Sequence, residues 1–187
     1  MNFIHKTVKI IAIALVLSVL TLVYGCQQTT LADNQGSVAK AVINSTSDPS
    51  KVMGEASFSR TKEGMLVETK INDAPPGQHG FHIHEIGNCA DKANAAQGHF
   101  NPDNMKHGLL VKDGFQNAHA GDLGNITISS DGKGTLSQTV SGLTLSGGKY
   151  AIKGLSVIVH EKVDDFSQPT GNAGGRIGCG IITTTET

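Results

Sequence analysis

The sequence predicts an all-β fold: eight antiparallel strands in a Greek-key sandwich or flattened barrel, with two long functional loops. Several short runs alternate apolar and polar residues with period two, which is the pattern of half-buried strands. The chain has 187 residues, of which 23 are glycine and only 4% are aromatic, and this composition suits strands and turns better than a helical bundle. No stretch has a convincing helical period, and the length suits one domain.

The first 25 residues are expected to lie outside the fold. Lys6 and Lys9 precede an apolar run, residues 10–23, which is short for a membrane span but fits a secretory signal peptide. The run ends at Gly25-Cys26 and resembles a bacterial lipobox, in which the cysteine is acylated. Ordinary cleavage near Gly25, leaving a spare thiol, is the alternative. The expected organisation is 1–25 signal peptide of the lipoprotein type, 26–37 flexible tether and 38–187 β-sandwich domain.

Charge and cysteine content narrow the partners and the compartment. Without the leader the chain keeps 13 Lys and Arg, which is 15 less Lys6 and Lys9, against 16 Asp and Glu. A mildly acidic chain without basic runs argues against a nucleic-acid partner. Export implies an oxidising compartment, so if Cys26 carries lipid, Cys89 and Cys179 are left as a disulfide pair. Two reduced buried thiols are the alternative.

Eight runs have the character of strands, with turn residues between them. The segment 61–64 ends in glycine and predicts a hairpin between the second and third runs, and residues 131–134 are a strong hairpin signal between the fifth and sixth. The expected strands are Val38–Ile43, Val52–Ser59, Met65–Ile71, Gly80–Glu85, Ile126–Ser129, Thr135–Val140, Leu155–His160 and Arg176–Ile182.

Two long connections carry polar residues instead of a regular period. The first runs from Ile86 to Asn125, about 40 residues, and such a loop is unusual in a compact domain unless it is functional or tied down. A metal and a disulfide would hold it. The second, Glu161 to Gly174, is shorter and polar.

Histidines gather in this part of the chain. His82 and His84 are two apart in a strand, so their imidazoles share one face while Phe81 and Ile83 share the other, apolar face. Seven of the eight histidines lie between residues 79 and 160. Six of them with one carboxylate exceed the needs of one ion and divide over two if one imidazole bridges. Four imidazoles suit Cu(II), and three imidazoles with a carboxylate suit tetrahedral Zn.

Five ordered motifs together resemble the copper/zinc superoxide dismutase family, over about Val38 to Ile182. The motifs are Gly80-Phe81-His82-Ile83-His84-Glu85, Gly98-His99-Phe100-Asn101-Pro102, His119-Ala120-Gly121-Asp122-Leu123-Gly124-Asn125, Val159-His160-Glu161-Lys162-Val163-Asp164-Asp165 and Gly171-Asn172-Ala173-Gly174-Gly175-Arg176-Ile177-Gly178-Cys179-Gly180. The combination is far more specific than any one of them.

The resemblance implies the site residues. Asp164 would hydrogen-bond histidines of both metal sites and fix their tautomers, and Cys89 and Cys179 would form the intrasubunit disulfide. His107 rests only on its order and a following glycine, and His79 is expected to pack the loop without ligating. The implied metal ligands are His82, His84, His99 and His160 for copper, and His99, His107, His119 and Asp122 for zinc, with His99 bridging.

The implied reaction converts two superoxide anions and two protons to oxygen and hydrogen peroxide by alternate reduction and reoxidation of copper, with zinc tuning the site. His99 would leave copper on reduction, take a proton and donate it to peroxide, and Arg176 would dock the anion. Beyond Glu161 the loop to residue 175 holds only Lys162, Asp164 and Asp165 as charges, so extensive steering is not transferred.

Two other functions remain open. One is a non-enzymatic copper-binding protein of the same fold, for storage or delivery. The other is an unrelated zinc hydrolase, which needs an open zinc position that the four implied ligands leave no room for. The expected location is the cell envelope after export, as a lipoprotein anchored in the membrane only through Cys26, otherwise periplasmic or secreted.

Overall fold

The structure of the chain is a computed structural model that describes residues 38–184. The expected signal peptide, the tether and Cys26 lie outside the described residues. The strands are β1 (Val38–Ser45), β2 (Val52–Arg60), β3 (Met65–Ile71), β4 (Gly77–His84), β5 (Asp122–Ile128), β6 (Gly134–Val140), β7 (Ser156–His160), β8 (Arg176–Ile181) and the short β9 (Thr183–Thr184).

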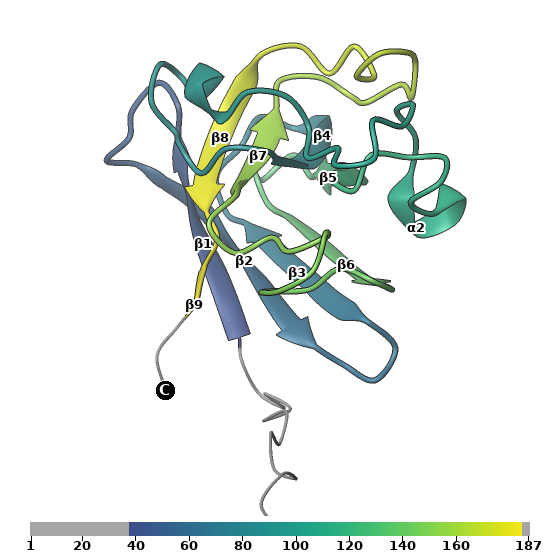
Figure 1. Cartoon of the computed structure of the whole chain (residues 1–187). Helices are drawn as coiled ribbons and strands as arrows, with labels where there is room; N and C mark the ends of the chain where they lie inside the picture. Colours follow the sequence, from purple (N-terminus) through teal and green to yellow (C-terminus); the bar gives the residue numbers. More distant parts are fainter. Residues whose placement is uncertain (1–37, 185–187) are drawn as a thin grey trace, which may run out of the picture. The chain divides into compact units, whose positions relative to one another are not determined.

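All strand pairs are antiparallel, in the order β5-β4-β7-β8-β1-β2-β3-β6, and β9 pairs with β1 (Figure 1). The two end strands approach each other at Gly134 of β6, where an added Cβ would lie 2.3 Å from the Thr127 carbonyl oxygen of β5. The sheet is therefore a nearly closed barrel. The prediction of an all-β fold with eight antiparallel strands is confirmed.

The two predicted hairpins have different outcomes. β3 pairs with β2 along its whole length, from Gly54↔Ile71 to Arg60↔Met65, as expected. Between β5 and β6 the turn forms, and the Ser129 N–H donates to the Lys133 carbonyl at 2.8 Å. The prediction that β5 and β6 pair with each other is wrong, however, because β6 pairs with β3 at all seven positions while β5 pairs with β4. The turn residues specify that the chain reverses direction, but β6 then forms its hydrogen bonds with the free edge of β3.

The long loop is more structured than its sequence indicates. It holds a 3₁₀ turn at Asn94–Ala96 and a helix α2 of four residues, Leu110–Asp113, so the expectation of no helix is wrong for two turns too short to have a readable period. β5 begins at Asp122, four residues before the expected start, because Asp122 pairs with His82 beyond a bulge in β5, where Leu123 and Gly124 together lie opposite Phe81 of β4. In residues 38–184 no helix has the length and apolarity to cross a membrane.

Both faces of β4 are buried at its end. Phe81 and Ile83 are fully buried in the barrel core, as predicted, and His82 and His84 on the other face are equally inaccessible. The loop that follows β4 covers this second face, and the disulfide between Cys89 and Cys179 ties that loop to β8, which confirms the expected pair. The barrel therefore supplies a rigid floor, and the loops close over it.

Candidate metal centre

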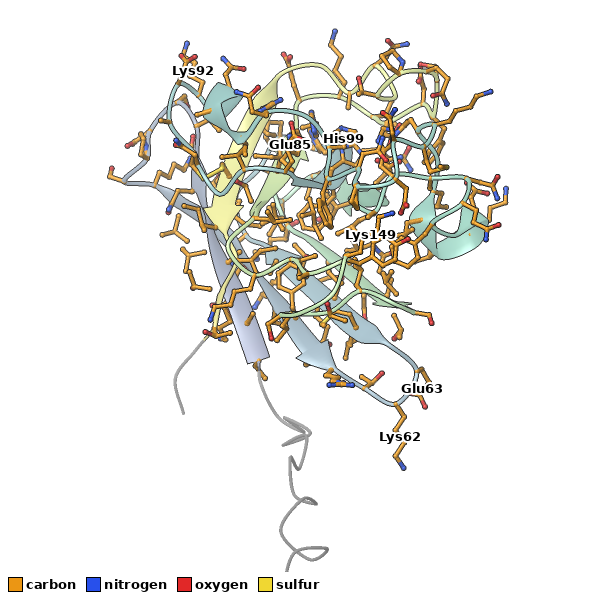
Figure 2. All side chains as sticks on the ribbon, viewed as in Figure 1. Lys62, Glu63, Glu85, Lys92, His99 and Lys149 are labelled. Carbon is orange, nitrogen blue, oxygen red and sulfur yellow. A yellow bond between two sulfur atoms is a disulfide. The ribbon has the colours of Figure 1, made fainter. Side chains whose placement is uncertain are left out.

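The seven predicted ligands come from three strands and the long loop. β4 carries His82 and His84, β7 ends at His160, and β5 begins at Asp122. The loop contributes the remaining three histidines, and each of the seven side chains belongs to a residue that is at most 6% exposed. Figure 2 places His99 among side chains near Glu85, at the opposite end of the sheet from Lys62 and Glu63 on the β2–β3 turn.

The copper set is assembled as predicted. His82, His84, His99 and His160 each bring one candidate ligand atom, and these atoms lie within 4.8 Å of one another. His84 Nε2 and His160 Nε2 are 3.3 Å apart, and the ring centroids of His82 and His99 are 4.1 Å apart. Four imidazoles converge on one point, which is the donor set that Cu(II) prefers.

The zinc set also forms, with the same 4.8 Å limit on its ligand atoms. Asp122 is its centre, since one carboxylate oxygen lies 2.8 Å from His99 Nδ1 and 3.1 Å from His119 Nδ1, and the other lies 2.9 Å from His107 Nδ1. His107, which the sequence supported only by order, stands beside the others. Three imidazoles and a carboxylate match a closed tetrahedral zinc site.

The unpaired nitrogens test whether metals fit. A buried polar atom without a partner costs free energy, so such atoms are rare in a native protein. Within residues 38–184, His82 Nδ1 and His107 Nδ1 are two of the three buried side-chain N or O atoms that lack a hydrogen bond. His107 Nδ1 lies near the Asp122 carboxylate without hydrogen-bond geometry. His82 belongs to the copper set and His107 to the zinc set, so one ion bound in each set would give both nitrogens a partner.

Asp164 joins the two sets. Its Oδ2 accepts from His82 Nε2 at 2.9 Å, and its Oδ1 accepts from His107 Nε2 at 2.9 Å. Because these bonds use Nε2 of each ring, they leave Nδ1 as the free nitrogen. The side chain of Asn125 in turn holds the Asp164 backbone, accepting from its N–H at 2.7 Å and donating to its carbonyl at 2.9 Å.

Burial keeps the copper-site imidazoles neutral, which is the form that ligates. Desolvation, together with neighbouring histidines, lowers the pKa of His84 to about 2 and that of His160 to about 3. Desolvation also lowers the pKa of His99 to about 4 although Asp122 opposes it.

His107 behaves in the opposite way. Burial lowers its pKa, but the nearby carboxylates of Asp122 and Asp164 outweigh burial and raise it to about 9. Burial raises the pKa of the Asp122 carboxyl, but the surrounding imidazoles of His107, His119 and His99 outweigh it and hold that pKa well below its usual range. The raised pKa favours the protonated form of His107 in the metal-free protein, and zinc binding requires loss of that proton.

Arg176 lies beside the copper set. It begins β8 opposite His160 of β7, and it is partly exposed. Its guanidinium donates to the Ala93 carbonyl and, at 2.5 Å, to the Gln97 carbonyl, which also accepts from His84 Nδ1. Both carbonyls belong to the loop that the disulfide anchors. The positive charge is thus fixed rather than left to swing in solvent.

The remaining histidine of this region, His79, belongs to neither set. Its ring nitrogens lie 2.8 Å from the carbonyl oxygens of His160 and Pro75. It packs, as expected, although it lies on β4 rather than in a loop. The sequence did not single out Asn125 or Gly171, whose roles depend on contacts with Asp164 that no spacing reveals.

Comparison with known proteins agrees with this geometry. Residues 52–182 match the family model described as copper/zinc superoxide dismutase (SODC). An extracellular superoxide dismutase [Cu-Zn] of Caenorhabditis elegans is 38% identical over 145 residues, which cover 74% of this chain and 64% of that protein. Superoxide dismutase [Cu-Zn] 2 of Brassica juncea is 40% identical over 150 residues, which cover 76% of this chain and 94% of that protein.

Solved structures give the same answer for the fold. A double mutant of a SOD-like protein from Bacillus subtilis has a TM-score of 0.68 at 34% identity, covering 77% of this chain and 96% of that one. The clock protein EA4 has a TM-score of 0.68 at 32% identity, covering 81% of this chain and 97% of that one. The chain belongs to the copper/zinc superoxide dismutase family and brings together both a four-histidine copper site and a His₃Asp zinc site.

Proposed function

We propose that this chain is an exported superoxide dismutase, which converts two superoxide anions and two protons to oxygen and hydrogen peroxide. The observation that carries the proposal is the position of His99, which belongs to both ligand sets. Its Nδ1 lies 3.3 Å from His119 Nδ1 on the zinc side, which leaves Nε2 for the copper side. His99 would hold both ions, and an imidazole shared in this way would couple them.

When bound, copper supplies the one-electron redox chemistry, and zinc supplies a fixed positive charge on the far nitrogen of His99. Arg176 docks superoxide, because its guanidinium is a positive fork beside His84 and His160 and is already fixed by two carbonyls. Superoxide is small and singly charged, so a fixed cation next to the copper set is enough to orient it.

His99 carries the proton at Nε2. During the half-reaction that forms oxygen, Nε2 takes up a proton while Nδ1 stays on the zinc side, held among His119, His107 and Asp122. In the other half-reaction Nε2 gives this proton to the reduced substrate, and solvent supplies the second one that hydrogen peroxide requires. Asp164 keeps His82 and His107 in the tautomer that each site needs.

The test is dismutation by the protein loaded with both metals. His160→Ala removes one of four copper ligands and should abolish nearly all activity, whereas Lys62→Ala, on the distant β2–β3 turn, should leave it unchanged. A wild-type protein that holds both metals in full and yet does not dismute superoxide would refute the proposal.

A non-enzymatic copper-binding role is the second candidate. The loop from residue 161 to 175 has few charges to draw superoxide in, and EA4, which shares the fold, is named a clock protein. Fold alone does not settle function. This role predicts that the bound copper exchanges readily with a chelator while turnover is negligible. Slow exchange with rapid turnover excludes it.

For the location, we propose that residues 1–25 are removed and that the lipid on Cys26 anchors the chain to the cell envelope through the tether 26–37. The Cys89–Cys179 disulfide and the extracellular relative support export. Mass spectrometry of the mature N-terminus tests the anchor, which requires an acylated Cys26. An N-terminus without lipid would leave a periplasmic or secreted protein.

A further inference from the structure

The segment Asp164–Gln168 surrounds the zinc-site histidine His107 on three sides. Asp164 binds Nε2 of its ring, as described above. The ring of Phe166 stacks on the imidazole, with centroids 6.3 Å apart and planes at 20°. Gln168 contacts the backbone of the same residue. Only the first of these contacts belongs to the proposed function.

The contact of Gln168 is double. Its Oε1 accepts from the His107 N–H at 3.0 Å, and its Nε2 donates to the His107 carbonyl at 2.9 Å. One side-chain amide therefore pairs with both backbone groups of one residue, as a neighbouring strand would. His107 lies in the irregular loop, where no strand holds its backbone. With Gln168 on the backbone and Asp164 on the ring, the ligand is fixed at both ends.

The segment is itself braced, so Gln168 does not have to be ordered by the metal. The Phe166 N–H donates to Asp164 Oδ1 at 2.8 Å. The Asn172 amide donates to Asp165 Oδ2 at 3.1 Å and to Ser167 Oγ at 2.9 Å. A preformed clamp lowers the conformational cost of binding an ion.

We propose that Gln168 is a positioning residue for the zinc site. It holds the backbone of His107 in place, and through this contact the loop from residue 161 to 175 increases the affinity of the site for zinc. The inference rests on the zinc site of the proposed function, but its readout is metal affinity rather than dismutation. Partners that orient a metal ligand typically contribute about 10- to 100-fold to metal affinity.

Two substitutions separate the hydrogen bonds from bulk. Gln168→Ala removes both bonds. Gln168→Glu keeps the size and the acceptor for the His107 N–H, but it places a carboxylate oxygen against the His107 carbonyl and cannot donate there. Gln116→Ala is the matched control, since Gln116 is exposed in the loop that carries His107. Because Gln168 is itself exposed, neither variant leaves a buried cavity.

The experiment measures Zn²⁺ and Cu²⁺ affinities of the full-length metal-free protein by competition with a chromophoric chelator, with Co²⁺ as a spectroscopic probe of the zinc site. Both Gln168 variants should lose about 10-fold or more in Zn²⁺ affinity and shift the Co²⁺ visible bands. Their Cu²⁺ affinity and melting temperature should match those of Gln116→Ala. Wild-type Zn²⁺ affinity in both variants, wild-type affinity in Gln168→Glu alone, or an equal loss for both metals overturns the proposal.

Discussion

Gly171 is the position where a single methyl group should disable both metal sites. Its φ is +74°, and an added Cβ would lie 1.7 Å from Asp164 Oδ1 and 2.7 Å from His107 Nε2. Asp164 cannot move aside without losing contacts, because Asn125 holds its backbone and the imidazoles of His82 and His107 hold its carboxylate. The Gly171→Ala change must push the Asp164 carboxylate away from its bridge.

Two terms add in this variant. Forcing a residue with a side chain into the left-handed region costs about 1–2 kcal/mol, which lowers the melting temperature by about 2–4 °C per kcal/mol in a domain of this size. Loss of the Asp164 bridge frees Nε2 of His82 and His107 and should weaken binding of each metal by about 10- to 100-fold. The second term is specific to the site.

Gly147→Ala separates the two terms. Gly147 has a φ of +73°, but an added Cβ there meets nothing within 4 Å. Metal affinities are measured by chelator competition and stability by thermal unfolding of the metal-free proteins. Both variants should lose similar backbone stability, and only Gly171→Ala should lose affinity for copper and zinc together. If Gly171→Ala binds both ions as Gly147→Ala does, the account of Asp164 as the bridge is refuted.

Three further outcomes are expected. Cys89→Ser opens a loop of 90 residues and should cost about 4–5 kcal/mol in denaturant unfolding under non-reducing conditions, and a loss below about 1 kcal/mol would contradict this. Arg176→Lys keeps the charge but loses the fork held by two carbonyls, so kcat/KM for superoxide should fall on the order of tenfold, with metal content unchanged. The metal-free protein should be most stable near pH 6.5. As the pH falls below 6.5, His84, His99 and His160 are protonated in the unfolded chain but stay neutral in the folded one, so the free energy of unfolding decreases. The raised pKa of His107 contributes stability that is fully present below pH 6.5 and is lost as the pH rises through about 9. A free energy of unfolding that does not change between pH 5 and 9 would refute this prediction.

Much of the fold is readable from local pattern. The strands β2 and β3 were predictable almost to the residue, because one face of each alternates into the core. The pairing of β6 was not, since the turn at residues 131–134 indicates a reversal but says nothing about which edge is free. The start of β5 at Asp122 depends on a bulge in β5, and a bulge is decided by how two strands pair.

The metal centre divides in the same way. His82 and His84 on one strand face are a local fact, and the other ligands follow once the family resemblance is recognised. The sequence does not indicate that the Gln97 carbonyl accepts from both His84 and Arg176. Every residue has a backbone carbonyl, so the residue type does not show which carbonyl forms these bonds. Nor does the sequence indicate the Gln168 clamp, whose partner is 61 residues away.

These hidden contacts decide the chemistry, since an imidazole has two nitrogens and a metal site needs one of them. In this chain the unused nitrogen is occupied in advance: Nε2 of His82 and His107 by Asp164, and Nδ1 of His84 by the Gln97 carbonyl. His99 is the exception, because both of its nitrogens are needed. With the tautomers of His82, His84 and His107 held in this way, the proposed reaction assigns the change of protonation during turnover to His99, which belongs to both ligand sets.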